Sequence, residues 1–189
     1  MTVFKRAIFL LGFFLLPFCG GSASAAVHTP PLQQLQESVN SAVASVRHSV
    51  VTVKARKKST AAGGGILWYE SIGSGFFVDA RGFILTNYHV VEEAEEITVT
   101  LWRSGRNEFQ ARVAHADRDL DLSLLKIDDV GDFPVVGFGN SDRIETGDWT
   151  ISIGSPFGFE HSVSLGIVSD LHRDLMIEGL TYKDMIQTD

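Results

Sequence analysis

The sequence contains one cysteine, Cys19, and therefore cannot form an intramolecular disulfide or a cysteine-rich zinc module. It also lacks a surplus of positive charge, because 16 Lys and Arg stand against 23 Asp and Glu and the formal net charge is -7. Nucleic-acid binding needs clustered basic residues, so we expect no nucleic-acid partner. With 5 prolines, 18 glycines and 44% hydrophobic residues, the composition is typical of a globular chain and excludes a disordered or collagen-like one.

The N-terminus has no hydrophobic run long enough to span a bilayer. Residues 7–18 are apolar, but this stretch is shorter than the roughly 20 residues that a transmembrane helix needs. It follows the basic pair Lys5-Arg6 and precedes Ala23-Ser24-Ala25, which supplies the small residues of a signal-peptidase site. This order predicts a signal peptide over residues 1–25. Its removal would leave no membrane span and would place the protein in the periplasm or another extracytoplasmic compartment.

Two other interpretations of this segment stay open. Without cleavage, the apolar stretch would serve as a buried helix or a membrane anchor. In addition, Cys19 lies where a bacterial lipoprotein signal has its lipidated cysteine, although bulky Phe18 occupies a position that normally holds a small residue. Lipidation through Cys19 is therefore an alternative to cleavage after Ala25.

Downstream, the hydrophobic pattern changes from a helical period to a strand period. Within an N-terminal segment, residues 26–48, apolar residues recur every three or four positions from Pro31 to about Arg47, which predicts a short amphipathic helix. From Ser49 onward, short alternating runs are separated by turn residues: 51–53, 77–78, 83–85, 97–101, 111–113, 122–125, 149–153 and 163–165. Many short strands with frequent turn signals predict an all-β barrel or sandwich. The glycine-rich stretch 56–71 lacks periodicity and predicts a flexible surface loop.

One histidine and one aspartate are the candidates for chemistry. His89 follows the apolar run 83–85 and precedes an acidic turn, and the end of a strand is a rigid place for a general base. Asp121 begins the run 122–125, where a carboxylate can accept a hydrogen bond from an imidazole, fix its tautomer and stabilise the imidazolium. Judged by residue type alone, a core or surface histidine and a turn or capping aspartate are the competing interpretations.

The motifs around these residues resemble those of the HtrA/Deg family of trypsin-like serine proteases. Eight motifs stand in the family's order between about Ser49 and the last residue: Gly73-Ser74-Gly75-Phe76, Thr86-Asn87-Tyr88-His89-Val90-Val91, Asp121-Leu122-Ser123-Leu124-Leu125-Lys126-Ile127, Gly137-Phe138-Gly139-Asn140-Ser141-Asp142, Gly147-Asp148-Trp149, Ile153-Gly154-Ser155-Pro156-Phe157-Gly158, Gly166-Ile167-Val168-Ser169 and Ile186-Gln187-Thr188-Asp189.

This resemblance implies a chymotrypsin/trypsin-like double β-barrel. The first barrel, roughly residues 49–132, would be complete, and the second would be incomplete, so that residues 49–189 form a trypsin-like serine protease domain truncated at its C-terminus. By the resemblance, His89 is the general base and acid and Asp121 orients it. The implied activity is that of a serine endopeptidase of extracytoplasmic protein quality control, which cleaves unfolded polypeptides.

The family's nucleophile is absent from the 189 residues. In the family, the Gln-Thr-Asp motif is soon followed by Gly-Asn-Ser-Gly-Gly, which supplies the attacking serine and the oxyanion hole. No Gly-x-Ser-x-Gly elbow replaces it, Ser155 lies in a turn of structural type, and Ser169 falls in an expected strand. We therefore expect an inactive polypeptide that is a fragment of a longer protease with PDZ domains. The alternative is a non-catalytic module that binds peptides or assembles with sister subunits.

No cofactor or metal ion is expected. The acidic run 92–96 lacks the central glycine of a calcium loop and is expected to be a solvated face. The remaining histidines are scattered and form no spaced ligand set: His28, His48, His115, His161 and His172.

The expected partners are unfolded or misfolded polypeptides. The resemblance also implies a homotrimer formed through the N-terminal part of the protease domain. Trp68 and Tyr69, in the glycine-rich stretch, would either contact sister subunits in such an assembly or pack on the protein's own barrel.

Overall fold

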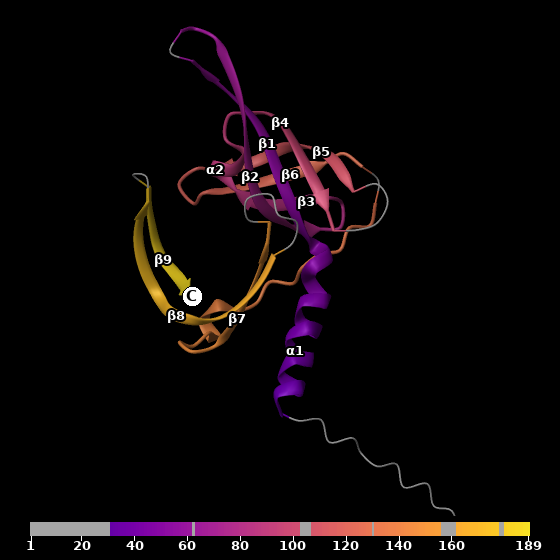
Figure 1. The fold of residues 1–189 in the computed structure, drawn as a ribbon, viewed down its shortest axis with the longest axis vertical. Helices are drawn as coiled ribbons and strands as arrows, with labels where there is room; N and C mark the ends of the chain where they lie inside the picture. The colour runs from indigo at the N-terminus through magenta and orange to yellow at the C-terminus, as the bar shows by residue number, and fades with distance from the viewer. Residues whose placement is uncertain (1–30, 62, 103–106, 130, 156–161, 178–179) are drawn as a thin grey trace, which may run out of the picture.

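The computed structural model describes residues 31–61, 63–102, 107–129, 131–155, 162–177 and 180–189 (Figure 1). The expected signal peptide, residues 1–25, lies outside the described residues, as do Cys19, His28 and His161. Within the described ranges, no helix combines the length and the apolar character that crossing a membrane would require.

The chain enters the fold through a helix that stands away from the rest of the molecule (Figure 1). Helix α1 (Pro31–Val46) continues into a short 3-10 turn, η1 (Arg47–Ser49), and confirms the helix expected from the spacing of apolar residues. None of its residues is buried, and Leu32 is 78% exposed. Exposed side chains four residues apart support it, as in the Gln33 to Glu37 hydrogen bond of 3.2 Å.

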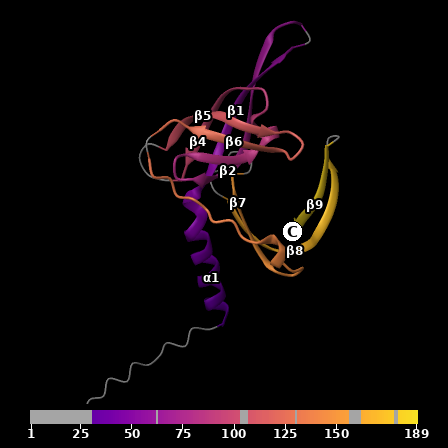
Figure 2. The same cartoon turned by 180° about the vertical axis from the view of Figure 1, so that it is seen from behind.

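Six antiparallel strands form a closed barrel with the order β1-β2-β3-β6-β5-β4 (Figures 1 and 2). They are β1 (Val50–Thr60), β2 (Ile66–Asp79), β3 (Phe83–Asn87), β4 (Ala94–Leu101), β5 (Glu108–Asp117) and β6 (Leu122–Ile127). Alternate residues of each strand point inward, which is why the period-two runs of the sequence located the strands correctly. The inward side chains make the core: Val51, Val53, Ala55, Phe77, Ile84, Val99, Leu125 and Ile127 are all fully buried.

Phe133, just beyond the last strand of the barrel, completes this core. Its ring stacks on Phe77 with centroids 4.8 Å apart and meets Phe109 edge to face at 6.0 Å. The backbone N–H of Phe133 donates to the carbonyl of Ala80 at 3.2 Å, which ties the connecting segment to the end of β2. The linker to the second half of the molecule is therefore part of the first barrel's packing.

The stretch 56–71, expected to be a flexible loop, is instead an extended hairpin. Strands β1 and β2 stay paired up to Thr60 and Ile66, so the hairpin projects beyond the barrel at the top of Figure 1. The guanidinium of Arg56 lies 4.3 Å from the centre of the Trp68 ring, a cation–π contact between the strands. Beyond Lys57, both faces of this hairpin are exposed, so its strands carry no alternation of apolar and polar residues, and the expectation of a loop was wrong for that reason.

The second half of the described chain is an open sheet of three strands in the order β7-β8-β9. A 3-10 turn, η2 (Ser141–Arg143), precedes β7 (Trp149–Gly154), β8 (Ser162–Ile177) and β9 (Leu180–Thr188). Sequence patterns predicted β7 and the start of β8 but not β9. Among the described side chains of these strands, Val168 is the one buried apolar residue. The fold is thus all-β, with one complete barrel and one partial sheet, as expected.

Candidate active site

His89 lies in a single helical turn packed against the barrel. Helix α2 (Tyr88–Val91) begins directly after β3 and buries Val90 and Val91. Beneath it, a Cβ atom added to Gly73 would lie 2.6 Å from Cγ2 of Val90. Glycine is therefore required at position 73 for the turn to sit directly on β2, and this packing holds the backbone of His89 in place.

Asp121 is the residue before β6 and has a backbone conformation that few residues other than glycine, asparagine and aspartate adopt. Its φ of 51° lies in the left-handed region, in a turn where its N–H donates to the carbonyl of Arg118 at 3.2 Å. The carbonyl of Asp121 accepts hydrogen bonds from the Tyr88 N–H and from the Asn87 side-chain amide, both at 3.1 Å. Since β3 also pairs with β6, these bonds fix Asp121 beside the start of α2.

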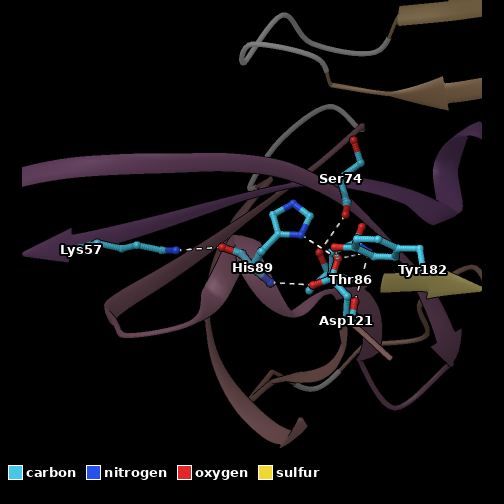
Figure 3. A network of polar contacts seen from close by, with 7 residues as sticks. Lys57, Ser74, Thr86, His89, Asp121 and Tyr182 are labelled. Atoms are coloured by element: carbon cyan, nitrogen blue, oxygen red, sulfur yellow. Dashed lines mark hydrogen bonds and ion pairs between the residues drawn. The ribbon is translucent and has the colours of Figure 1, made fainter. Parts of the chain in front are cut away.

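The structure brings the two predicted residues into direct contact, as Figure 3 shows. Nδ1 of His89 lies 2.7 Å from Oδ2 of Asp121, and the backbone N–H of His89 donates to Oδ1 at 2.9 Å. An ionised carboxylate only accepts hydrogen bonds, so the ring proton belongs on Nδ1 and Nε2 keeps a free lone pair. The arrangement is that of a base whose tautomer is fixed by a carboxylate.

The two side chains differ sharply in exposure. The Asp121 side chain is 5% exposed, whereas that of His89 is 57% exposed. Burial opposes ionisation of Asp121, but the hydrogen bonds from the His89 backbone and imidazole outweigh it, and the pKa of the carboxyl lies below its usual value. A charged, enclosed carboxylate therefore supports an imidazole that is open to solvent.

Two residues that the sequence did not single out complete this network, and both are drawn in Figure 3. The hydroxyl of Tyr182, on β9, donates to Oδ2 of Asp121 at 3.3 Å. The ammonium of Lys57, on β1, donates to the main-chain carbonyl of His89 at 2.8 Å. Neither residue lies in a motif that points to chemistry, so no local signal in the sequence could have identified them.

A seam of hydroxyl groups joins the barrel to the second sheet. Oγ of Ser155, just after β7, lies 2.5 Å from Oγ1 of Thr52, and the Ser155 N–H donates to Oγ of Ser74 at 2.8 Å. Ser155 is 1% exposed, so its hydroxyl is a buried structural contact. Ser169 lies on β8, and no contact places it next to His89.

A pocket of about 350 Å³ lies beside this seam, between the barrel and the end of β7. Its walls are mostly apolar, with Phe76, Leu85 and Ile153 among them. Asn87, two residues before His89, and Leu122, directly after Asp121, also line the pocket. Neither His89 nor Asp121 is among the lining residues, so the pocket meets the histidine–aspartate pair only through these neighbours.

Outside this site, the described histidines make isolated contacts. Nδ1 of His172 lies 2.5 Å from Oδ1 of Asp184 on the exposed β8–β9 ribbon, and the hydrogen bond to this carboxylate raises the His172 pKa. His48 contacts the carbonyl of Trp102 at 3.0 Å, and His115 is exposed on β5. No cluster of His, Cys, Asp and Glu suited to a metal ion occurs in the described part of the chain.

In this chain, a histidine follows the third strand of a closed six-stranded barrel, and an aspartate hydrogen-bonded to it precedes the last strand of the barrel. These features define a trypsin-like serine protease domain. A profile of the family of trypsin-like peptidase domains matches residues 73–189. In Pseudomonas fulva, a protein named probable periplasmic serine endoprotease DegP-like is 48% identical over 120 residues, or 64% of this chain and 24% of that protein. A protein of the same name from Marinomonas sp. is 44% identical over 120 residues.

Solved structures agree with these sequence relatives. The HtrA-type protease AlgW with a tripeptide matches at a TM-score of 0.66 and 35% sequence identity, over 78% of this chain and 44% of that one. A variant of AlgW with a decapeptide matches at a TM-score of 0.70 and 32% identity, over 78% of this chain and 49% of the other. The chain belongs to the HtrA/Deg family of trypsin-like serine proteases. It spans 24% of the length of the curated relatives that it matches.

Proposed function

We propose that His89 and Asp121 are the general base and the orienting carboxylate of a serine endopeptidase that acts in extracytoplasmic protein quality control. The observation that carries this proposal is the 2.7 Å contact between Nδ1 of His89 and Oδ2 of Asp121, which leaves Nε2 on the open side of the ring. A buried ionised carboxylate on one ring nitrogen and a lone pair on the other are what proton transfer from a serine hydroxyl requires.

The reaction follows from these two groups. Nε2 of His89 accepts the proton of a serine hydroxyl as the serine oxygen attacks the peptide carbonyl, and the imidazolium is stabilised by Asp121. The imidazolium then gives that proton to the departing amine, leaving an acyl-enzyme and a neutral ring. Nε2 next deprotonates a water molecule that attacks the acyl group, and returns the proton to the serine oxygen. Asp121 stays ionised throughout.

The attacking serine is not among these 189 residues, which contain no Gly-Asn-Ser-Gly-Gly motif. The activity is therefore proposed for a polypeptide that carries this segment together with the histidine–aspartate pair. The 189 residues alone should not hydrolyse peptides, because loss of a triad member costs several orders of magnitude in rate and loss of the oxyanion hole removes the residual catalysis.

The substrates proposed are unfolded or misfolded polypeptides, which can pair as extended strands with a free sheet edge. This proposal is supported by relatives named periplasmic endoproteases and by AlgW structures that contain peptides. Export through a cleaved signal peptide and assembly into a homotrimer belong to the same proposal. The exposed helix α1 and the exposed hairpin residues Trp68 and Tyr69 are available for such contacts.

The decisive experiment uses the complete gene product, assayed against unfolded casein and with a serine-directed fluorophosphonate probe. We expect His89→Ala to lower casein hydrolysis by several orders of magnitude while peptide binding stays nearly intact. Equal loss of hydrolysis and binding would mean that His89 is structural, and the proposed role would be wrong. The 189-residue polypeptide is the matched control. If it cleaves casein and the fluorophosphonate blocks this cleavage, the proposed inactivity is wrong.

A second candidate function, a peptide-binding or assembly module without catalysis, is favoured by one observation. Large apolar side chains are exposed on the hairpin and on the open sheet, including Leu67, Trp68, Trp149 and Met176. A gene product that binds unfolded casein but takes no fluorophosphonate label and leaves casein intact would support this function over the first.

A further inference from the structure

Lys57 lies on the face of β1 that otherwise carries core residues. Along β1, Val51, Val53 and Ala55 point inward and are fully buried, and Lys57 is the next residue on that face. It is 5% exposed, although lysine is almost never fully buried without a partner. A buried ammonium is expensive unless it is hydrogen-bonded, so the position of its acceptor indicates what the residue does.

The neighbouring strand carries a β-bulge at this point. In the pairing of β1 with β4, Arg56 faces Glu96 while Lys57 faces Ala94, so the extra residue, Glu95, lies on β4 and the alternation of β1 is unbroken. Here the ammonium of Lys57 reaches α2 and donates to the carbonyl of His89 at 2.8 Å (Figure 3).

The peptide groups on both sides of the His89 Cα are therefore held. Asp121 accepts from the His89 N–H at 2.9 Å, and Lys57 donates to the His89 carbonyl at 2.8 Å. The imidazole itself has one polar tether, at Nδ1, and is otherwise largely exposed. A four-residue helix has too few internal hydrogen bonds to fix its own backbone, so these two outside partners hold it at His89, beside the packing of Val90 on β2.

We propose that Lys57 is a positioning residue for His89, which acts by holding the carbonyl of the α2 turn against β1 so that Nε2 keeps its direction. This inference rests on the proposed function of His89. Lys57 touches neither the imidazole nor any reacting atom, and its effect passes through the backbone of the turn.

The substitution that tests this role is Lys57→Met, which keeps an apolar stem of similar length and removes the donor. Lys57→Arg retains a donor and serves as the conservative variant. Lys58→Met is the matched control, because Lys58 is the next residue on β1, points outward and pairs with Glu95 at 2.5 Å in an exposed ion pair. An exposed pair of this kind contributes about 0–1 kcal/mol, so the control should behave like the parent chain.

The first readout needs only the 189-residue polypeptide. Nuclear magnetic resonance follows solvent exchange of the His89 Nδ1–H proton, with the amide of fully buried Val53 as the internal reference for barrel stability. We expect Lys57→Met to speed Nδ1–H exchange at least about tenfold relative to the Val53 amide, Lys57→Arg to restore most of the protection, and Lys58→Met to change nothing. Unchanged Nδ1–H exchange in Lys57→Met would overturn the proposal. Equal acceleration of exchange at the Val53 amide would also overturn it, because Lys57 would then only stabilise the barrel as a whole.

The second readout is kinetic and uses the complete gene product. Lys57→Met should lower kcat by about 10- to 100-fold with KM nearly unchanged, as expected when a catalytic group is misplaced by an ångström or less. A fall in kcat/KM that comes only from a higher KM would count against the positioning role. If His89→Ala leaves hydrolysis unchanged, the proposed function fails, and the exchange experiment still decides whether Lys57 holds the histidine.

Discussion

The hydroxyl of Tyr182 on β9 donates a hydrogen bond of 3.3 Å to Oδ2 of Asp121, the carboxylate oxygen that also contacts His89. This bond joins the second sheet to a pair of residues that otherwise belongs to the first barrel. Asn87 contributes a further donor to the same oxygen at 3.2 Å. The ionisation of Asp121 therefore depends on residues from both halves of the chain.

The first prediction concerns Tyr182→Phe, which removes one of the hydrogen bonds that lower the pKa of Asp121. The pKa of the carboxyl should rise toward its usual value, because hydrogen bonds to the charged form favour that form. Titration of the Asp121 carboxyl carbon by nuclear magnetic resonance measures this change. Tyr69→Phe, on the exposed hairpin, is the control and should leave the Asp121 titration where it is; an unchanged titration in Tyr182→Phe would contradict the prediction.

The second prediction concerns the pH dependence of stability. Because the folded-state pKa of Asp121 lies below the value of an unperturbed aspartate, 3.8, its ionised form stabilises the native state above that pH. This stabilisation is lost as the pH falls from 3.8 through the lower folded-state pKa.

Asp121→Asn should remove this component. The variant should unfold more easily at neutral pH by about 1.5–3 kcal/mol, the usual contribution of hydrogen bonds to a charged group. The difference in unfolding free energy between the variant and the parent protein should shrink as the pH falls below the range in which the carboxyl of Asp121 ionises. Urea unfolding of both proteins between acidic and neutral pH measures the difference, and a constant gap across that range would show that ionisation of Asp121 does not contribute.

The third prediction is that Phe133→Ala destabilises the barrel by about 3–5 kcal/mol, the range for removing a buried aromatic ring. Phe133 is 3% exposed and packs on Phe77 and Phe109. Phe138→Ala is the matched control, because Phe138 is 74% exposed, and it should cost less than about 1 kcal/mol. Equal effects of the two substitutions on the urea midpoint would mean that the segment after β6 is not part of the core.

The fourth prediction is that the two halves differ in local stability. The barrel strands contribute the fully buried side chains Val51, Ile84 and Leu125, whereas Val168 is the buried apolar residue among the described side chains of β7, β8 and β9. Hydrogen exchange of the described backbone should therefore be faster in the open sheet than in the barrel, because local opening exposes few apolar contacts there. Uniform protection of all nine strands would contradict this prediction.

The sequence predicted those parts of the fold in which one face of a strand is buried. Alternation in the runs 83–85 and 122–125 identified β3 and β6, and the positions of His89 and Asp121 next to these strands anticipated the pair that the structure brings together. Apolar and polar residues alternate along a strand only when one of its faces is buried, so the pattern does not identify a strand whose two faces are both exposed. That is why the hairpin around Arg56 and Trp68 was taken for a loop and why β9 was missed.

Contacts between distant elements could not be predicted in the same way. Lys57 on β1 reaches His89 on α2, 32 residues further along the chain, and Tyr182 reaches Asp121 only because β9 folds back toward the barrel. Neither the contact between β1 and α2 nor the return of β9 leaves a signal within a few residues of the side chain concerned. Such supporting residues depend on tertiary geometry, and a list of motifs omits them.

The seam made by Thr52, Ser74 and Ser155 bears on how the two halves of the molecule can move. At this junction the halves meet through hydroxyl groups, and each hydrogen bond there has a net value of about 0.5–1.5 kcal/mol. A rotation of the sheet against the barrel would break these bonds and would also draw Tyr182 away from Asp121, the carboxylate that contacts His89. The three hydroxyl side chains of the seam therefore keep the sheet where the Tyr182 hydroxyl can reach that carboxylate.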